Sequence, residues 1–311
     1  MKVSVDAWDP SYGTSVDSDP LADPTASVNV AVERPTGDWA PIAPPAGQAT
    51  PEEVVFVDGV RRVEARVWVE PDAADGEVAA GLCASWAAGA VRCNGGPSRL
   101  VAAQVGRGLF SASPHARDLV TRHGSFIGYV TAGATPEALS LALQERMTAA
   151  ELDVAATART DGRALLVVDG PLRGRQHLTG AVGLVKTHHV DYLPAEVRGV
   201  LRALGPGQRT PVFTIGTTWS RHSWYLRLPG PNGGPMAGIV RIEAAATLSP
   251  ADAARLADVT ATMLPRFAST PHKDPRAPQN LVPIAGLERE LRRRLGDPQL
   301  LYRALRVAAA A

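Results

Sequence analysis

The chain has 311 residues, 45% of them hydrophobic and 20% charged, with a formal net charge of +1. This composition is ordinary for a soluble globular protein with a large core, and it excludes the strongly basic character of many nucleic-acid-binding proteins. A local basic lining, such as the arginines within 289–294, would still be enough to contact phosphates.

The sequence predicts a cytoplasmic protein without a membrane partner. Its longest run of small apolar residues, at 78–91, is too short to cross a bilayer, and the first residues lack the apolar region of a secretory signal. Cys83 and Cys93 form no CxxC pair, so we expect them to be reduced thiols in the core.

The first 50 residues are rich in proline and acidic residues. Alternating sequences at 3–8 and 28–32 are typical of edge strands, and prolines between 41 and 45 make a stiff connector. We expect an extended, β-rich and partly ordered N-terminal arm over residues 1–50, with a dimer or partner contact as the alternative. The remaining residues, 51–311, are expected to form one domain.

From residue 51 the pattern is that of an α/β fold, because strands come first and helices then mix with strands. A long helix is expected over 137–159, since Pro136 stands at the first helical position, where proline is tolerated. Strands are expected over 54–58, 61–70, 78–92, 100–111, 126–131, 164–168, 182–187, 212–217, 224–228 and 238–243. Further helices are expected over 194–204, 250–267 and 281–295.

Two of the apolar, β-branched runs end in an aspartate followed by a glycine, at Asp58-Gly59 and Asp169-Gly170. Such a strand is buried, so each aspartate would lie where the sheet reaches the surface, and the glycine would allow a sharp turn. Either pair alone is ordinary turn chemistry. Together, two carboxylates at strand ends suit a hard divalent cation.

The long helix before Asp169 offers a third carboxylate. Glu151 is our choice and Glu145 the competitor, although a helical glutamate is usually solvated. Aspartate on a strand, glutamate on a helix and aspartate on a second strand is the order in which ribonuclease H-like nucleases assemble a site for two metal ions.

This order of residues resembles the NurA nucleases, which process DNA ends together with the hexameric ATPase HerA. The resemblance covers about residues 50–300, and the order and spacing of its motifs carry it rather than any single one. The matching motifs are Val-Asp-Gly at 57–59, Val-Asp-Gly-Pro-Leu at 168–172, Val-Lys-Thr at 185–187, Trp-Tyr-Leu-Arg-Leu at 224–228, Val-Arg-Ile-Glu at 240–243 and Pro-Arg-Ala-Pro-Gln-Asn-Leu-Val-Pro-Ile at 275–284.

The resemblance implies a ribonuclease H-like mixed sheet flanked by helices. It also implies 5′–3′ exonuclease and single-strand endonuclease activity in double-strand-break resection, a HerA-type ATPase partner and a homodimer. The implied cofactor is Mn²⁺ (or Mg²⁺), as two ions.

The resemblance assigns metal ligation to Asp58, Glu151 and Asp169 and places Tyr225 beside the site. The family's late metal-binding histidine is missing from this chain. Gln279 stands at its position, and His272, seven residues earlier, could substitute for it. A neutral amide oxygen would hold Mn²⁺ more weakly than an imidazole.

Basic residues near the expected strand ends could contact phosphates. Lys186 would steady the scissile phosphate or the attacking hydroxide, or else it is a surface lysine. Arg173 and Arg175 suit DNA phosphates, or are solvated loop residues.

Two alternatives to a DNA nuclease stay open. Gln279 motivates a catalytically weak or inactive DNA-binding adaptor of a HerA-type ATPase. An RNA-directed nuclease of the same fold is the other alternative, because phosphate contacts carry no base information. The sequence lacks the G-x-x-x-x-G-K-[ST] motif, so ATP hydrolysis would have to come from a partner.

Overall fold

The computed structural model of the chain describes residues 26–70, 78–158, 164–178, 180–188, 190–230 and 234–310. The expected strand at 3–8 and the expected turn at 161–162 lie outside these residues. The chain forms two compact units. The first unit takes in the described residues of Met1–Phe56, Cys93–Ser98 and Thr160–Ala285, and the second unit those of Val57–Arg92, Arg99–Arg159 and Gly286–Ala311.

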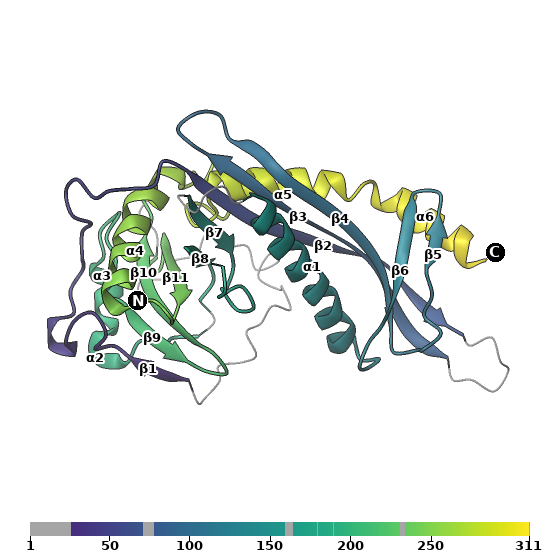
Figure 1. Ribbon diagram of the computed structural model, residues 1–311, viewed down its shortest axis with the longest axis horizontal. Coiled ribbons are helices and arrows are strands. Elements are labelled where there is room, and N and C mark those ends of the chain that lie inside the picture. The colour runs from purple at the N-terminus through teal and green to yellow at the C-terminus, as the bar shows by residue number, and fades with distance from the viewer. Residues whose placement is uncertain are drawn as a thin grey trace. The chain divides into compact units, whose positions relative to one another are not determined.

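The first unit is built on a mixed sheet (Figure 1). Its strands are ordered β1-β9-β10-β11-β8-β7. β7 and β8 are parallel, and the other neighbours are antiparallel. The strand bounds are β1 Ser27–Asn29, β7 Leu165–Asp169, β8 Ala181–Val185, β9 Phe213–Gly216, β10 Ser220–Arg227 and β11 Ile239–Ala245.

Helices cover both faces of this sheet. Trp224 and Tyr225 are neighbours on β10 and therefore point to opposite faces. On the Trp224 face, the indole Nε1 donates to Thr260 Oγ1 of α4 (Pro250–Met263) at 3.1 Å. On the Tyr225 face, α2 (Ala195–Arg198) and α3 (Val200–Ala203) pack into one buried apolar cluster with Tyr225.

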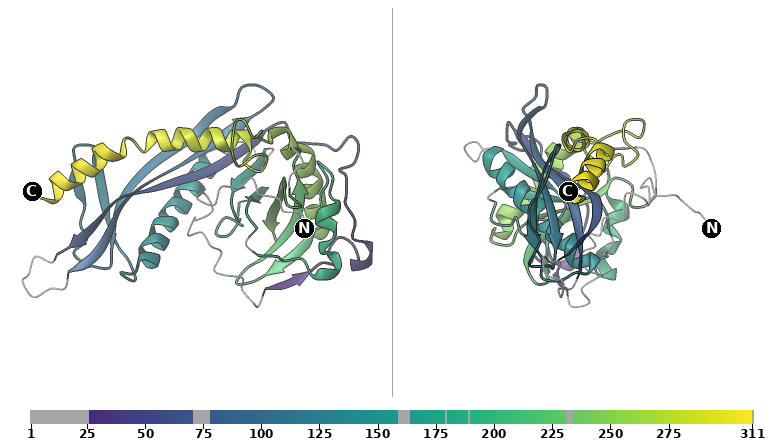
Figure 2. Two further views of the ribbon diagram at one scale, coloured as in Figure 1. Left: turned by 180° about the vertical axis from the view of Figure 1, so that it is seen from behind. Right: turned by 90° about the vertical axis from the view of Figure 1, so that its right-hand side faces the viewer.

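The second unit has the strand order β2-β3-β4-β6-β5. α1 covers one face of its long strands, and α5 and α6 cover the other (Figures 1 and 2). The bounds are β2 Val54–Val69, β3 Ala79–Cys93, β4 Arg99–Ser111, β5 Leu119–Thr121, β6 Gly124–Val130, α1 Pro136–Ala158, α5 Val282–Arg294 and α6 Pro298–Ala309. The predicted mixed α/β architecture with flanking helices is therefore confirmed.

The structure corrects several details of the prediction. β2 runs unbroken from Val54 to Val69, so no strand ends at Asp58-Gly59. The helix expected over 194–204 is divided at Gly199 into two short helices. α6 was not expected at all. Its N-cap is Asp297, whose side chain accepts hydrogen bonds from the backbone N–H groups of Gln299 and Leu300.

Cys83 and Cys93 are free and buried, as expected from the sequence. Burial raises the pKa of Cys83 to about 12 and that of Cys93 to about 11, so both thiols stay protonated and unreactive at neutral pH. Within the described part of the chain, no helix is both long and apolar enough to cross a membrane.

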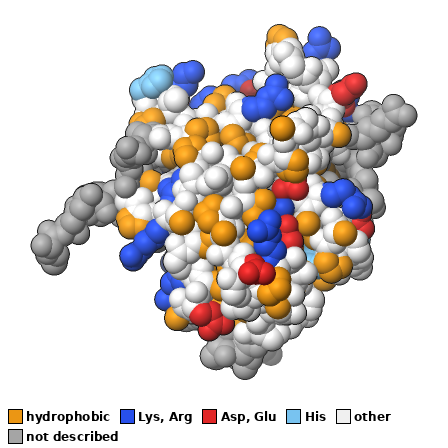
Figure 3. Space-filling model, turned by 90° about the vertical axis from the view of Figure 1, so that its left-hand side faces the viewer, with side chains coloured by type: hydrophobic (Ala, Val, Ile, Leu, Met, Phe, Trp, Pro, Cys, Tyr) orange, Lys and Arg blue, Asp and Glu red, His pale blue; other side chains and the backbone are white. Residues whose placement is uncertain are grey.

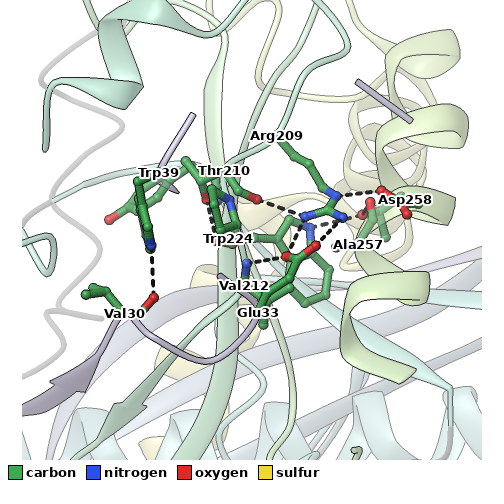
Figure 4. A network of polar contacts seen from close by, with 12 residues as sticks. Val30, Glu33, Trp39, Arg209, Thr210, Val212, Trp224, Ala257 and Asp258 are labelled. Atoms are coloured by element: carbon green, nitrogen blue, oxygen red, sulfur yellow. Dashed lines mark hydrogen bonds and ion pairs between the residues drawn. The ribbon is translucent and has the colours of Figure 1, made fainter. Parts of the chain in front are cut away.

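A buried ion-pair network fastens residues 26–50 to the rest of the first unit (Figure 4). Arg209 is 1% exposed and donates to both carboxylate oxygens of Glu33, at 2.8 and 2.9 Å. Its Nε donates to Asp258 of α4 at 2.7 Å. Glu33 also accepts the backbone N–H of Val212 at 2.7 Å, and the Trp39 indole donates to the Val30 carbonyl at 2.9 Å. With β1 paired to β9, these bonds hold the segment in place.

Glu33 should make the stability of the protein depend on acid pH. Burial by itself raises the pKa of Glu33, but the bonds from Arg209 and from the Val212 N–H outweigh it, and the pKa lies below its ordinary value of 4.5. A lowered folded-state pKa means that the carboxylate stabilises the fold above pH 4.5 and that this contribution is lost as the pH falls through the folded value. We expect the urea midpoint to fall as the pH drops below 4.5, and to fall less in Glu33→Gln. Equal pH profiles for the two proteins would contradict this role.

Candidate functional site

In the second unit, Glu151 of α1 lies against Gly59, the residue that follows Asp58. A Cβ added to Gly59 would lie 2.4 Å from Glu151 Oε1 and 2.9 Å from Met147 Cγ. Asp58 Oδ1 accepts the Gly59 N–H at 2.8 Å, and both acidic residues are buried. Glu145, the competitor on the same helix, is exposed. The glycine therefore makes room for a helix carboxylate rather than for a turn.

Adding a methyl group at Gly59 tests this close approach. In Gly59→Ala the new Cβ must displace Glu151 and Met147, so we expect the free energy of unfolding to fall by about 1–3 kcal/mol. Gly286→Ala is the matched control, because no atom lies within 4 Å of a Cβ there and the residue lies inside α5. The control should gain up to about 1 kcal/mol from helix propensity. Urea unfolding measures both, and equal stabilities would refute the close approach.

In the first unit, Asp169 and Lys186 form an ion pair at the ends of neighbouring strands. Asp169 is the last residue of β7, and the chain turns directly after it at Gly170, whose φ is +89°. Lys186 follows β8, and its Nζ donates to Asp169 Oδ2 at 2.7 Å. Since β7 and β8 are parallel, both residues reach the same edge of the sheet. Among the described residues, the positive charge that balances Asp169 is therefore the ammonium group of Lys186.

Two residues that the sequence reasoning missed continue this polar chain. Lys186 Nζ also donates to Asn280 Oδ1 at 2.8 Å, and Asn280 Nδ2 donates to Asp274 Oδ2 at 2.7 Å. Burial by itself raises the pKa of Asp274, but the Arg276 backbone N–H, the Asn280 amide and the Arg276 charge outweigh it and lower that pKa. The sequence offers no signal for these contacts, because Asn280 lies 94 residues after Lys186 and no motif links the two.

A buried glutamate supports the loop that follows Asp169. A Cβ added to Gly183 would lie 2.8 Å from Gly170 O and 2.8 Å from Leu172 N, so the loop crosses directly over β8. The Leu172 N–H donates to Glu243 Oε2 at 3.0 Å. Glu243 Oε1 accepts from Arg221 at 2.8 Å and from Arg241 at 2.9 Å. This fully buried network fixes the path of the loop.

Tyr225 lies on the other face of the sheet from Asp169. The strand register aligns Asp169, Leu184, Ile242 and Trp224 across the sheet, so these side chains share a face. Tyr225 follows Trp224 and points to the opposite face, where its ring stacks on Phe213 with centroids 5.9 Å apart. Burial raises the pKa of Tyr225. The register therefore does not bring Tyr225 to Asp169 and Lys186.

The two candidates for the late metal ligand are placed differently from each other. His272 is exposed in a turn. Gln279 is buried, and its Nε2 donates to the Ile239 carbonyl at 3.4 Å.

The two arginines predicted to contact DNA phosphates differ in their exposure. Arg173 is exposed in the loop after Asp169, whereas Arg175 is buried and its Nη1 donates to the Pro171 carbonyl at 2.9 Å. The last three arginines of α5 pair with glutamates of the same helix, Arg292 with Glu288 and both Arg293 and Arg294 with Glu290. On the face in Figure 3, Lys and Arg side chains lie among acidic and hydrophobic ones.

The chemistry of the three acidic residues suits a hard divalent cation. Asp58, Glu151 and Asp169 offer only carboxylate oxygens, which Mn²⁺ and Mg²⁺ accept and which soft metals disfavour. Asp58 and Glu151 belong to the second unit and Asp169 to the first. Among the residues that the structure describes, no group of three or more His, Cys, Asp or Glu side chains is arranged to hold an ion.

Comparison with known proteins identifies the family. The model of the NurA domain matches residues 135–292, which is just over half of the chain. The chain belongs to the NurA family. The NurA match includes Glu151, Asp169, Lys186 and Gln279, and it begins after Asp58.

Comparison of whole folds finds a NurA structure as well. The crystal structure of the NurA nuclease from Sulfolobus solfataricus has a TM-score of 0.44 and 12% sequence identity, over 83% of this chain and 84% of that one. No curated protein matches the chain significantly.

Proposed function

We propose that this NurA-family chain is a metal-dependent nuclease that hydrolyses phosphodiester bonds of DNA. The observation that carries the proposal is Glu151 held against Gly59 beside Asp58, in a chain whose NurA match also contains Asp169 and Lys186.

In this proposal the three carboxylates hold two divalent ions, which would polarise the phosphate and supply hydroxide when bound. Lys186 donates a hydrogen bond to a phosphate oxygen and so offsets its negative charge. Arg173, exposed in the loop after Asp169, contacts a neighbouring DNA phosphate. Arg175 shapes that loop through the Pro171 carbonyl.

The finer features follow the resemblance of the sequence. They are a preference for Mn²⁺, 5′–3′ exonuclease and single-strand endonuclease activity, a homodimer, and a HerA-type hexameric ATPase as partner in the cytoplasm. The sequence has no P-loop motif, so the partner would supply ATP hydrolysis.

A cleavage assay tests the proposal. End-labelled linear duplexes, single-stranded DNA and matched RNA are incubated with the purified protein in Mn²⁺, Mg²⁺ or EDTA, with and without the ATPase. We expect DNA cleavage with Mn²⁺ and none in EDTA. Failure to cleave DNA in every metal, with the partner present, refutes the proposal, and preferential cleavage of RNA would move the assignment to an RNA nuclease.

A second candidate function is a DNA-binding adaptor that regulates the ATPase without cutting DNA. The observation that favours it is the Lys186–Asp169 ion pair, in which a protein ammonium already balances the carboxylate. Gln279 at the position of the family's histidine points the same way. Calorimetric titration with Mn²⁺ separates the two functions. Metal binding supports the nuclease, and DNA binding without metal binding supports the adaptor.

A further inference from the structure

A chain of hydrogen bonds in the first unit leads from Asp274 to Asp169. Asp274 accepts from the Asn280 amide, Asn280 accepts from the Lys186 ammonium, and Lys186 donates to Asp169 at 2.7 Å. Asn280 is 0% exposed, Asp274 5% and Lys186 9%. A buried polar chain of this kind fixes the direction of each member, because any reversal leaves a buried group without its partner.

The chemistry of the two ends dictates how the Asn280 amide is turned. An ammonium can only donate, so the Asn280 oxygen must face Lys186. A carboxylate can only accept, so the Asn280 NH₂ group must face Asp274. The backbone N–H of Arg276 donates to the other oxygen of Asp274 at 2.8 Å and so fixes the orientation of that carboxylate.

We propose that Asn280 and Asp274 are positioning residues for Lys186. They keep the ammonium on Asp169 and aim its remaining N–H at an anionic oxygen of the substrate. An ammonium has three N–H donors, and the contacts described for Lys186 use two of them. The inference rests on the proposed function for the identity of the acceptor, a phosphate oxygen of DNA.

Nuclear magnetic resonance of lysine side chains tests the positioning without any cleavage. In the full chain labelled with ¹⁵N-lysine, a buried and hydrogen-bonded ammonium exchanges slowly enough to be observed, and its absence in Lys186→Met assigns it. We expect the signal to be lost in Asn280→Leu and weakened in Asp274→Asn. Thr260→Val is the matched control, because it removes another buried hydrogen bond, that from Trp224, and should keep the signal. Persistence of the signal in both Asn280→Leu and Asp274→Asn overturns the proposal.

A double-mutant cycle then links the positioning to turnover. We expect Asn280→Leu to lower kcat by about 10- to 100-fold with little change in KM, and to lower it less than about 2-fold when Lys186 is already methionine. Equal effects in the two backgrounds would mean that Asn280 acts on the fold and not through Lys186, which overturns the proposal. If Asn280→Leu does not fold, Asp274→Asn takes its place in the cycle.

The cleavage assay and the lysine measurement can fail independently of each other. A wild-type protein that cuts no DNA refutes the proposed nuclease, whereas the lysine signal still decides whether Asn280 and Asp274 position Lys186.

Discussion

Asp58→Asn and Asp169→Asn are each expected to lower the rate of DNA cleavage by about 1,000-fold or more, which is about 4 kcal/mol of transition-state stabilisation. The reason is that asparagine keeps the shape of the side chain but removes the anionic oxygen on which a hard divalent cation depends. Initial rates on end-labelled DNA at saturating Mn²⁺ measure the effect. Glu151→Gln should behave in the same way.

Asp153→Asn is the matched control for Glu151→Gln. Asp153 lies on the same helix but is exposed, so its carboxylate is solvated and the variant should cleave DNA at close to the wild-type rate. If the Asp58 and Asp169 variants cut as fast as this control, the acidic residues do not hold the catalytic ions and the assignment of the site is wrong.

The second large effect concerns folding. Arg209→Leu is expected to lower the free energy of unfolding by about 3–5 kcal/mol, because it leaves the carboxylates of Glu33 and Asp258 without their shared partner. Denaturation in urea, followed by circular dichroism, measures the loss. We also expect residues 26–50 to become sensitive to protease in this variant before the rest of the chain does.

Arg255→Leu serves as the control for Arg209→Leu. Arg255 pairs with Asp252 on the exposed side of α4, with 68% of its side chain in solvent, so its removal should change stability little. If the two variants lose similar amounts of unfolding free energy, burial does not determine how strongly the Arg209 network stabilises the protein.

The sequence was most informative for the long helices and strands. The helix expected over 137–159 is α1, Pro136–Ala158, and the strand expected over 100–111 is β4, Arg99–Ser111. It was misleading at Gly59, since glycine permits both a turn and a close helix contact, and one sequence cannot tell the two uses apart. Gly170 shows the other use, with its positive φ after β7.

The pairing of Asp169 with Lys186 was within reach of sequence reasoning, because both were expected at strand ends. The supporting residues were not. Asn280 and Asp274 act through side-chain bonds whose partners lie far away in the chain, and Glu243 meets Leu172 only because the loop crosses Gly183. Periodicity reports which face of an element is buried, but not the route of the loop that reaches it.

The ion pair between Glu33 and Arg209 has a consequence for truncated forms of this protein. A chain that begins at residue 51 loses β1, which leaves β9 as an uncovered edge open to pairing with other molecules. It also strips one of the two acidic residues from a cation that has almost no access to water. Such a truncation should aggregate during purification under conditions in which the full chain does not, as light scattering would show.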